Sequence, residues 1–143
     1  MQKKYYSGKK KRHTQKTQVA VDKNSQKIIA TLFGKGRQHD FKIFKSENFP
    51  VSEDKQILVD SGYAGIQHYH KNSKLPHKRR KLKPLTQEQK QENKQLASDR
   101  VLSENINARV KRFKIISDRY RNRRKRFGLR FNLIAAINNF ELQ

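Results

Sequence analysis

The feature that most constrains this chain is a short run, residues 57–65, in which three apolar residues are followed by an acid and then by two glycines. The apolar part, residues 56–59, is typical of a strand buried on both faces of a parallel or mixed sheet. Asp60 then stands at the strand end, where the glycines let the backbone turn. Taken alone, such an Asp is more often a turn former, but a carboxylate held there can also bind a metal ion.

A second acid, Glu104, lies on a helical segment, residues 100–111, that leads into one of the most basic runs of the chain. A single helical acid is usually a solvated side chain. The face that carries it also holds Ala97, Val101 and Ala108, which leaves room for a ligand. Two carboxylates on different elements, surrounded by Lys and Arg, indicate metal-assisted chemistry on a phosphodiester.

The charge of the chain says most about its partner. The sequence holds 35 Lys and Arg against 12 Asp and Glu, a formal net charge of +23. Binding to nucleic acid releases counterions condensed on the phosphates, so this surplus favours a nucleic-acid partner. An anionic membrane would satisfy the same charge, but no apolar run approaches the roughly 20 residues that span a bilayer, and no signal peptide opens the sequence. We therefore expect a cytoplasmic, nucleoid-associated protein with no membrane partner.

Cysteine is absent from the sequence, which excludes disulfides, thiolate zinc sites and thiol nucleophiles. Any metal is then held by oxygen or imidazole ligands. His39, His68, His70 and His77 make a weak zinc set, because structural zinc usually takes four closely spaced ligands. A length of 143 residues predicts one domain. The hydrophobic fraction of 33% predicts that its core is thin.

Apolar periodicity and turn formers predict an α/β chain. A basic N-terminal segment, 1–17, is expected to be flexible and to precede a folded region, 18–143. The expected elements are a hairpin of residues 18–22 and 27–33, a short helix capped by Asp40, the strand 56–59, a loop over 67–84, a helix from Thr86 to about Ile116, and a helix over 129–140. The apolar stripe of the long helix is Leu102, Ile106, Val110 and Phe113.

Four motifs carry a resemblance to a known family. They are the Tyr-Ser-Gly-Lys-Lys-Lys-Arg-His sequence of residues 6–13, residues 36–40, residues 59–63, and residues 100–111 with the following Phe113 and Lys114. In this order they resemble the C-terminal part of the catalytic domain of a DDE-type insertion-sequence transposase, a DDE superfamily endonuclease. The resemblance covers essentially the whole chain, and the ordered set is much more specific than any one motif.

The resemblance implies a ribonuclease H-like (retroviral integrase-like) mixed sheet with flanking helices. In that family three acids bind two divalent ions, Mg²⁺ or Mn²⁺, which activate water and later a DNA 3′ hydroxyl for attack on phosphodiesters. By motif, Asp60 matches the second of these catalytic, metal-binding acids and Glu104 matches the third. The first acid, which the family carries in an Asp-Ala-Thr or Asp-Gly-Thr sequence on its first strand, has no match here.

The resemblance therefore implies a truncated, partial catalytic domain that lacks the first strand, which is central to the family's sheet and lies between the hairpin and the strand with Asp60. Its loss leaves unpaired sheet edges, and the chain alone is expected to be inactive because a two-metal site needs converging carboxylates. Three explanations stay open. The gene is a decayed element, or it is one frame of a two-frame element that is fused by frameshifting, or Asp22 or Asp40 replaces the first acid.

Double-stranded DNA, as transposon ends and target, is the partner that the resemblance implies, with the upstream half or intact transposase copies as protein partners. Basic residues after Glu104 are expected to contact phosphates and would otherwise form a solvated face. The expected DNA-binding residues are Arg109, Lys111, Arg112, Lys114, Arg119, Arg121, Arg123 and Arg124. The alternative function is a non-enzymatic basic nucleic-acid-binding protein or remnant, which would bind without a divalent ion.

Overall fold

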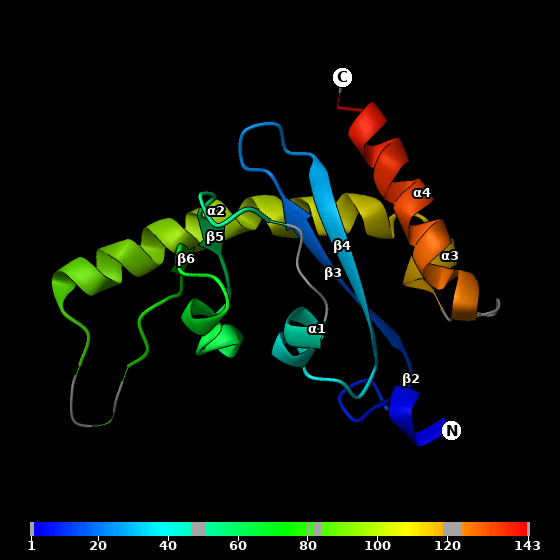
Figure 1. Ribbon diagram of the computed structural model, residues 1–143, viewed down its shortest axis with the longest axis horizontal. Coiled ribbons are helices and arrows are strands. Elements are labelled where there is room, and N and C mark those ends of the chain that lie inside the picture. The colour runs from blue at the N-terminus through cyan, green and yellow to red at the C-terminus, as the bar shows by residue number, and fades with distance from the viewer. Residues whose placement is uncertain (1, 47–50, 80, 82–83, 119–123, 143) are drawn as a thin grey trace.

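The computed structural model describes residues 2–46, 51–79, 81, 84–118 and 124–142. Helices and short strands are mixed along the chain, so the α/β class is confirmed (Figure 1). In chain order the elements are η1 (Gln2–Tyr5), β1 (Tyr6–Ser7), β2 (Arg12–His13), β3 (Gln15–Val21), β4 (Ile28–Lys35), α1 (Asp40–Ser46), β5 (Ile57–Leu58), η2 (Ser61–Tyr63), η3 (Ile66–His68), β6 (Ser73–Lys74), α2 (Gln87–Lys111), α3 (Lys114–Ser117), η4 (Arg124–Arg126) and α4 (Phe127–Phe140).

The β3–β4 hairpin is the centre of the fold and crosses the long helix α2 in Figure 1. Its strands pair antiparallel from Gln15 opposite Lys35 to Val21 opposite Ile28. The turn is closed by the carboxylate of Asp22, which accepts hydrogen bonds from the backbone N–H and the hydroxyl of Ser25 at 2.7 and 2.6 Å. The predicted hairpin is therefore confirmed, with β3 beginning three residues earlier than expected.

The two faces of the hairpin pack against different helices. Phe33 points to one face, where its ring meets Phe127 and Phe131 of α4 edge-on at centroid distances of 5.9 and 5.8 Å. The next residue back along β4, Leu32, lies on the other face and packs with buried Ile43 of α1. Alternate residues of one strand thus serve two clusters, as the period of a β-strand requires.

Helix α2 begins where the sequence predicts. The Thr86 hydroxyl accepts from the Gln89 backbone N–H at 3.2 Å, and the Gln89 side chain accepts from the Thr86 N–H at 3.2 Å, which is a capping box. The predicted apolar stripe faces the core: Ile106 and Val110 are buried, and Leu102 and Phe113 pack against the same cluster. The helix ends at Lys111 instead of near Ile116, because Phe113 takes an extended conformation before α3.

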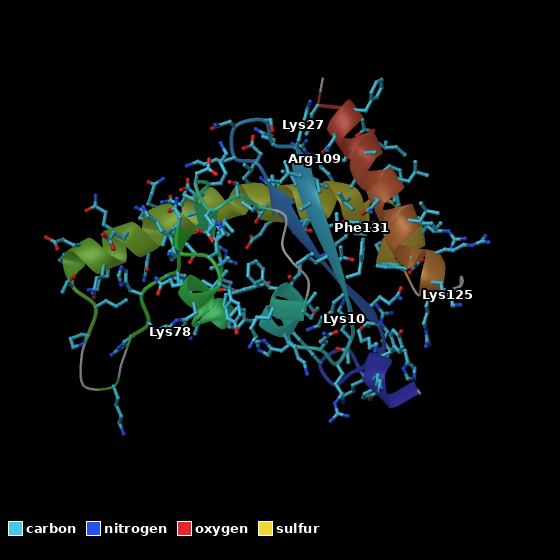
Figure 2. All side chains as sticks on the ribbon, in the orientation of Figure 1. Lys10, Lys27, Lys78, Arg109, Lys125 and Phe131 are labelled. Carbon is cyan, nitrogen blue, oxygen red and sulfur yellow. The ribbon has the colours of Figure 1, made fainter. Side chains whose placement is uncertain are left out.

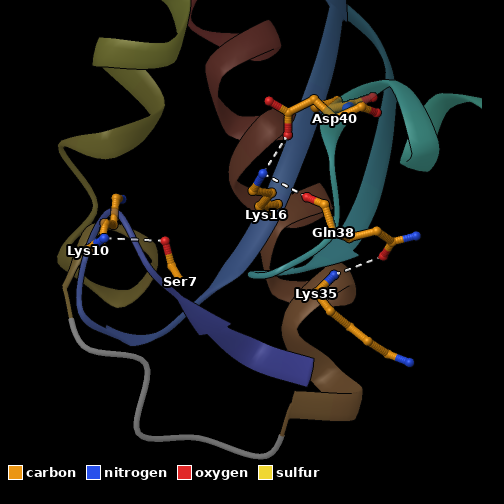
Figure 3. Close-up of polar contacts among 7 residues, drawn as sticks. Ser7, Lys10, Lys16, Lys35, Gln38 and Asp40 are labelled. Atoms are coloured by element: carbon orange, nitrogen blue, oxygen red, sulfur yellow. Dashed lines mark hydrogen bonds and ion pairs between the residues drawn. The ribbon is translucent and has the colours of Figure 1, made fainter. Parts of the chain in front are cut away.

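Two expectations about the other elements were wrong. Residues 56–59 are not a strand buried on both faces: β5 is two residues long, half-buried, and pairs in parallel with β6. Asp40 is the first residue of α1, and its carboxylate binds Lys16 Nζ at 3.0 Å instead of capping the helix (Figure 3). The segment 1–17 holds β1, β2 and the start of β3, and its flexibility stays a prediction.

The described strands form three two-stranded sheets, in which β1 pairs with β2, β3 with β4, and β5 with β6. A single mixed sheet therefore stays a prediction. None of the described helices combines the length and the apolar character that crossing a bilayer requires.

Candidate functional site

Asp60 lies two residues after the end of β5 and is the N-cap of the short helix η2. Its carboxylate accepts a hydrogen bond from the Ser61 backbone N–H at 2.6 Å, and its carbonyl accepts from the Tyr63 N–H at 3.0 Å. The side chain is 55% exposed. Two residues on, Gly62 has open space where a Cβ would lie. The local turn therefore fixes the backbone of Asp60 while one side of its carboxylate stays accessible.

Glu104 lies on the exposed face of α2, and its side chain is 67% exposed. Ala97, Val101 and Ala108, which share that face, are also exposed, as the helical spacing predicts. The surroundings of this carboxylate are therefore open to a ligand from solvent.

Arg100 joins the two acids. Its guanidinium lies 3.5 Å from an Asp60 carboxylate oxygen through one terminal nitrogen and 3.8 Å from a Glu104 carboxylate oxygen through the other. Arg100 and Glu104 are four residues apart on α2, the spacing at which helical side chains meet. The fold thus brings both predicted acids to one cation, although they are more than forty residues apart in the chain.

A cleft of about 800 Å³ adjoins this group and lies between β3, β5 and α2. Asp60 and Arg100 line it together with residues 18–22, at the end of β3, and residues 56–59, which include β5. Across it, Lys23 in the hairpin turn binds Asp99 of α2 at 2.8 Å. This hydrogen bond is the main reason why the pKa of Asp99 lies below its usual value. Glu104 is not among the cleft residues and reaches its edge through Arg100.

Tyr63 lies beside the acid pair in an aromatic group. Its ring packs against Phe41 and Phe44 of α1 at centroid distances of 5.8 and 6.1 Å. Burial, followed by the negative charges of Asp40 and Asp60, raises the pKa of Tyr63 to about 12. The phenol is therefore neutral, a hydrogen-bond donor and not a base, throughout the neutral range.

The proposed replacement acids are engaged elsewhere. Asp22 is held by Ser25, and the hydroxyl of Ser25 is the first cause of its lowered pKa. Asp40 binds Lys16. Among the residues that the structure describes, no three His, Asp or Glu side chains gather as a metal site. Of the histidines, buried His70 lies 3.2 Å from the Ser52 carbonyl oxygen, and His77 lies 2.6 Å from the Glu92 carboxylate.

The sequence of the chain was compared with those of known protein families. The sequence profile of the DDE superfamily endonucleases matches residues 1–139. The chain belongs to this family. The family is one of enzymes, and its match confirms the resemblance carried by the four motifs.

This family member is also similar to the protein named "Probable transposase for insertion sequence element IS702" of Microchaete diplosiphon, with 48% identity over 141 residues. The alignment covers 99% of this chain and 51% of the relative, so the chain spans about half the length of the curated relative that it matches. No solved structure matches the chain.

The predicted DNA-binding residues of the chain fall into three groups. Arg109, Lys111 and Lys114 are exposed at and beyond the end of α2. Two arginines have partners within the chain: Arg112 binds Glu141 at the end of α4, and Arg124 lies over the Tyr5 ring at 4.5 Å. The last group, Arg119, Arg121 and Arg123, lies outside the described residues.

Arg100 is a residue of the candidate site that the sequence patterns did not single out. The signal was present, because an arginine four residues before a helical glutamate predicts an ion pair. This spacing does not predict the other contact of Arg100, with Asp60, because that contact depends on how β5 and α2 pack.

Proposed function

We propose that the chain is the C-terminal half of the catalytic region of a DDE transposase that cleaves and joins DNA phosphodiesters at insertion-sequence ends. Asp60 and Glu104 are two of its three metal ligands, and Mg²⁺ or Mn²⁺ is the ion. The observation that carries the proposal is the convergence of these two acids, from separate elements, on the single guanidinium of Arg100. A family of endonucleases and a transposase relative support the same chemistry.

The side chains fit a hard divalent ion. Carboxylate oxygens are the ligands that Mg²⁺ and Mn²⁺ prefer, and both acids are exposed enough to exchange a cation with solvent. When bound, the metal supplies Lewis-acid activation of the attacking oxygen and neutralises charge at the phosphate. In its absence Arg100 limits the repulsion between two carboxylates that lie close to each other.

We propose that the third acid, and the strand that completes the sheet, come from a segment of the family that has no counterpart in this chain. The cleft between β3 and β5 supports this proposal because it lies between two strands that each pair on one side, β3 with β4 and β5 with β6, among the described residues. A strand seated in the cleft would pair with both and give the mixed, ribonuclease H-like sheet. It would also bring its own acid to the end of β5, beside Asp60.

Two origins of such a segment remain part of the proposal. It belongs to an upstream reading frame that is fused by frameshifting, or it belongs to intact transposase copies that associate with this chain. The relative extends well beyond the part that aligns here, which is consistent with either origin. Alone, the chain is proposed to be inactive on DNA.

The test is complementation. The chain is fused to the part of the Microchaete relative that has no counterpart here, and nicking of supercoiled DNA carrying the element's terminal repeats is followed with and without Mg²⁺. We expect Mg²⁺-dependent nicking that Asp60→Asn or Glu104→Gln abolishes. The matched control is Glu53→Gln, which removes one exposed acid from a loop and leaves nicking intact. Nicking that survives both acid substitutions would show that the two acids are wrongly assigned.

A second function, non-enzymatic nucleic-acid binding, is favoured by one observation. The described residues hold no cluster of three acids, whereas the sequence has a net charge of +23. A binder of this kind associates with DNA in a strongly salt-dependent and sequence-independent way, with no divalent requirement. If the fused protein binds the terminal repeats but does not nick them under any divalent condition, this second function replaces the first.

A further inference from the structure

The β1–β2 hairpin, residues 6–13, has no role in the proposed site of Asp60 and Glu104. Its strands pair Tyr6 with His13 and Ser7 with Arg12. The Ser7 hydroxyl accepts from the Lys10 backbone N–H at 3.3 Å and closes the turn (Figure 3). The turn and the returning strand are exposed and, apart from Gly8 and His13, carry only full positive charges: Lys9, Lys10, Lys11 and Arg12. The segment is therefore an ordered loop of cations.

This hairpin is attached to the body of the fold by its backbone. The Thr14 N–H donates to the Tyr5 carbonyl at 2.8 Å, and the Gly36 N–H donates to the Thr14 carbonyl at 3.0 Å. The approach at Gly36 is close enough that an added Cβ would lie 2.5 Å from the Tyr5 carbonyl oxygen. Two-residue strands are marginal by themselves, so these joins at the end of β4 are what hold the hairpin in place.

A second basic element meets the base of the hairpin. The Arg124 guanidinium lies over the Tyr5 ring at 4.5 Å, and the Gln15 side chain donates to the Arg124 carbonyl at 3.4 Å. Lys125 and Arg126 follow and are exposed. Figure 2 shows Lys10 and Lys125 in the same half of the molecule, away from Lys78. Cations from two distant parts of the sequence thus form one surface.

No carboxylate of the hairpin offsets this charge, because Asp22 is the first acidic residue of the sequence. Of the two rings at the base, Tyr5 lies under Arg124, and Tyr6, which is 44% exposed, packs edge-on against His13 at 5.8 Å. Proteins that hold single-stranded nucleic acid rely on free aromatic platforms for base stacking. A row of four exposed cations with a single partly exposed ring beside it fits the regularly spaced phosphates of a duplex better than a succession of stacked bases.

We propose that the β1–β2 hairpin, with Arg124, Lys125 and Arg126 beside its base, is a duplex-DNA clamp that binds the phosphate backbone without reading sequence. The inference rests on the proposed function for its ligand, duplex DNA, but not on the metal chemistry of Asp60 and Glu104. The hairpin positions DNA, and the acid pair acts on it.

The test uses the full chain, a random-sequence DNA duplex and EDTA, and it measures affinity over a range of salt concentrations. The hairpin variant is K9Q/K10Q/K11N, where Asn suits the positive φ of 48° at Lys11. The control K71Q/K78Q/K94Q removes the same charge from exposed sites outside the hairpin, and one of these, Lys78, lies at the other side of the molecule from Lys125 in Figure 2. We expect the slope of log affinity against log salt to fall by about 2 to 3 in the hairpin variant, close to 0.9 per lost phosphate contact, and to stay unchanged in the control.

A charge-neutral pair tests the joint at Tyr5. Tyr5→Ala removes the ring under Arg124 and is expected to weaken duplex binding about twofold to fivefold, whereas Tyr5→Phe keeps the ring and the affinity. Equal slopes for the hairpin and control variants would overturn the clamp while leaving Mg²⁺-dependent nicking by the fused protein as a separate result. If the hairpin variant loses affinity for RNA but not for duplex DNA, the surface is an RNA site and the proposal fails. Absence of any duplex binding by the unaltered chain would instead remove the substrate class of the proposed function.

Discussion

The two sides of the β3–β4 hairpin differ in how completely they are packed. On the α4 side, buried residues from β4, α2 and α4 form one large cluster that contains Ile106 and Phe131. On the α1 side, the cluster is smaller, and the neighbouring β5 is half-buried beside an open cleft. Asp60 lies on this second side. The α4 side is therefore packed more completely than the side that carries the predicted chemistry.

The largest expected difference between the two sides is in core truncation. Ile106, with no exposed surface, belongs to the α4-side cluster, and half-buried Ile57 lines the cleft. Ile106→Ala should lower the free energy of unfolding by about 2 to 5 kcal/mol, and Ile57→Ala by about 1 kcal/mol or less, because an open site can collapse. Urea unfolding followed by circular dichroism measures both. Equal losses would mean that the acid side is as tightly packed as the α4 side.

Glycine substitutions make the same comparison by adding an atom. At Gly34 an added Cβ would lie 2.5 Å from Cγ1 of Ile43, a fully buried side chain that has no room to move. At Gly62, beside Asp60, nothing lies within 4 Å. We expect Gly34→Ala to cost about 1 to 3 kcal/mol of unfolding free energy, and Gly62→Ala to change it by about 0.5 kcal/mol or less. Thermal unfolding distinguishes them, and a destabilised Gly62→Ala would show that the turn after Asp60 is more crowded than the structure has it.

The α4 side is also the side that the sequence predicts best, because its signals are local. The turn is fixed by Asp22 and Ser25, and α2 begins at a capping box that Thr86 and Gln89 form within one helical turn. The end of α2 was mispredicted. There Arg112 binds Glu141 from the far end of the chain, a contact that local propensity does not contain.

On the side that carries Asp60, the sequence predicts which residues matter and where a strand lies, but not how these parts pack together. The apolar run before Asp60 gave the right strand, but its length and burial depend on the neighbours available to pair with it, and β6 offers two residues. The spacing of Arg100 and Glu104 predicts their ion pair, whereas the link from Arg100 to Asp60 comes from packing of β5 near α2. The β1–β2 hairpin was missed because consecutive lysines conceal the alternation that marks a strand.

The ionisation of Tyr63 reports on the α1-side cluster beside Asp60. Burial and two nearby carboxylates raise its pKa from the model-compound value of 10.0 to about 12. A raised pKa favours the neutral phenol in the folded state. The resulting stabilisation is complete below pH 10 and is lost as the pH rises toward about 12. Ultraviolet titration of phenolate absorbance should show one late component that Tyr63→Phe removes and Tyr69→Phe retains. A late component that persists in Tyr63→Phe would place the buried phenol elsewhere.

Substitution of Arg100 is expected to have the smallest effect on stability but a clear effect on metal binding by Asp60 and Glu104. Its ion pairs are exposed, so Arg100→Gln should change the unfolding free energy by about 0.5 kcal/mol or less. The same substitution removes a positive charge that opposes a divalent ion between Asp60 and Glu104. Mn²⁺ binding, followed by electron paramagnetic resonance, should therefore tighten about threefold to tenfold. Arg109→Gln, an exposed arginine on the same helix, is the control and should leave Mn²⁺ binding nearly unchanged. If Arg100→Gln weakens Mn²⁺ binding, then Arg100 is needed to hold the two carboxylates in place, and the incomplete packing around Asp60 is compensated by this one side chain.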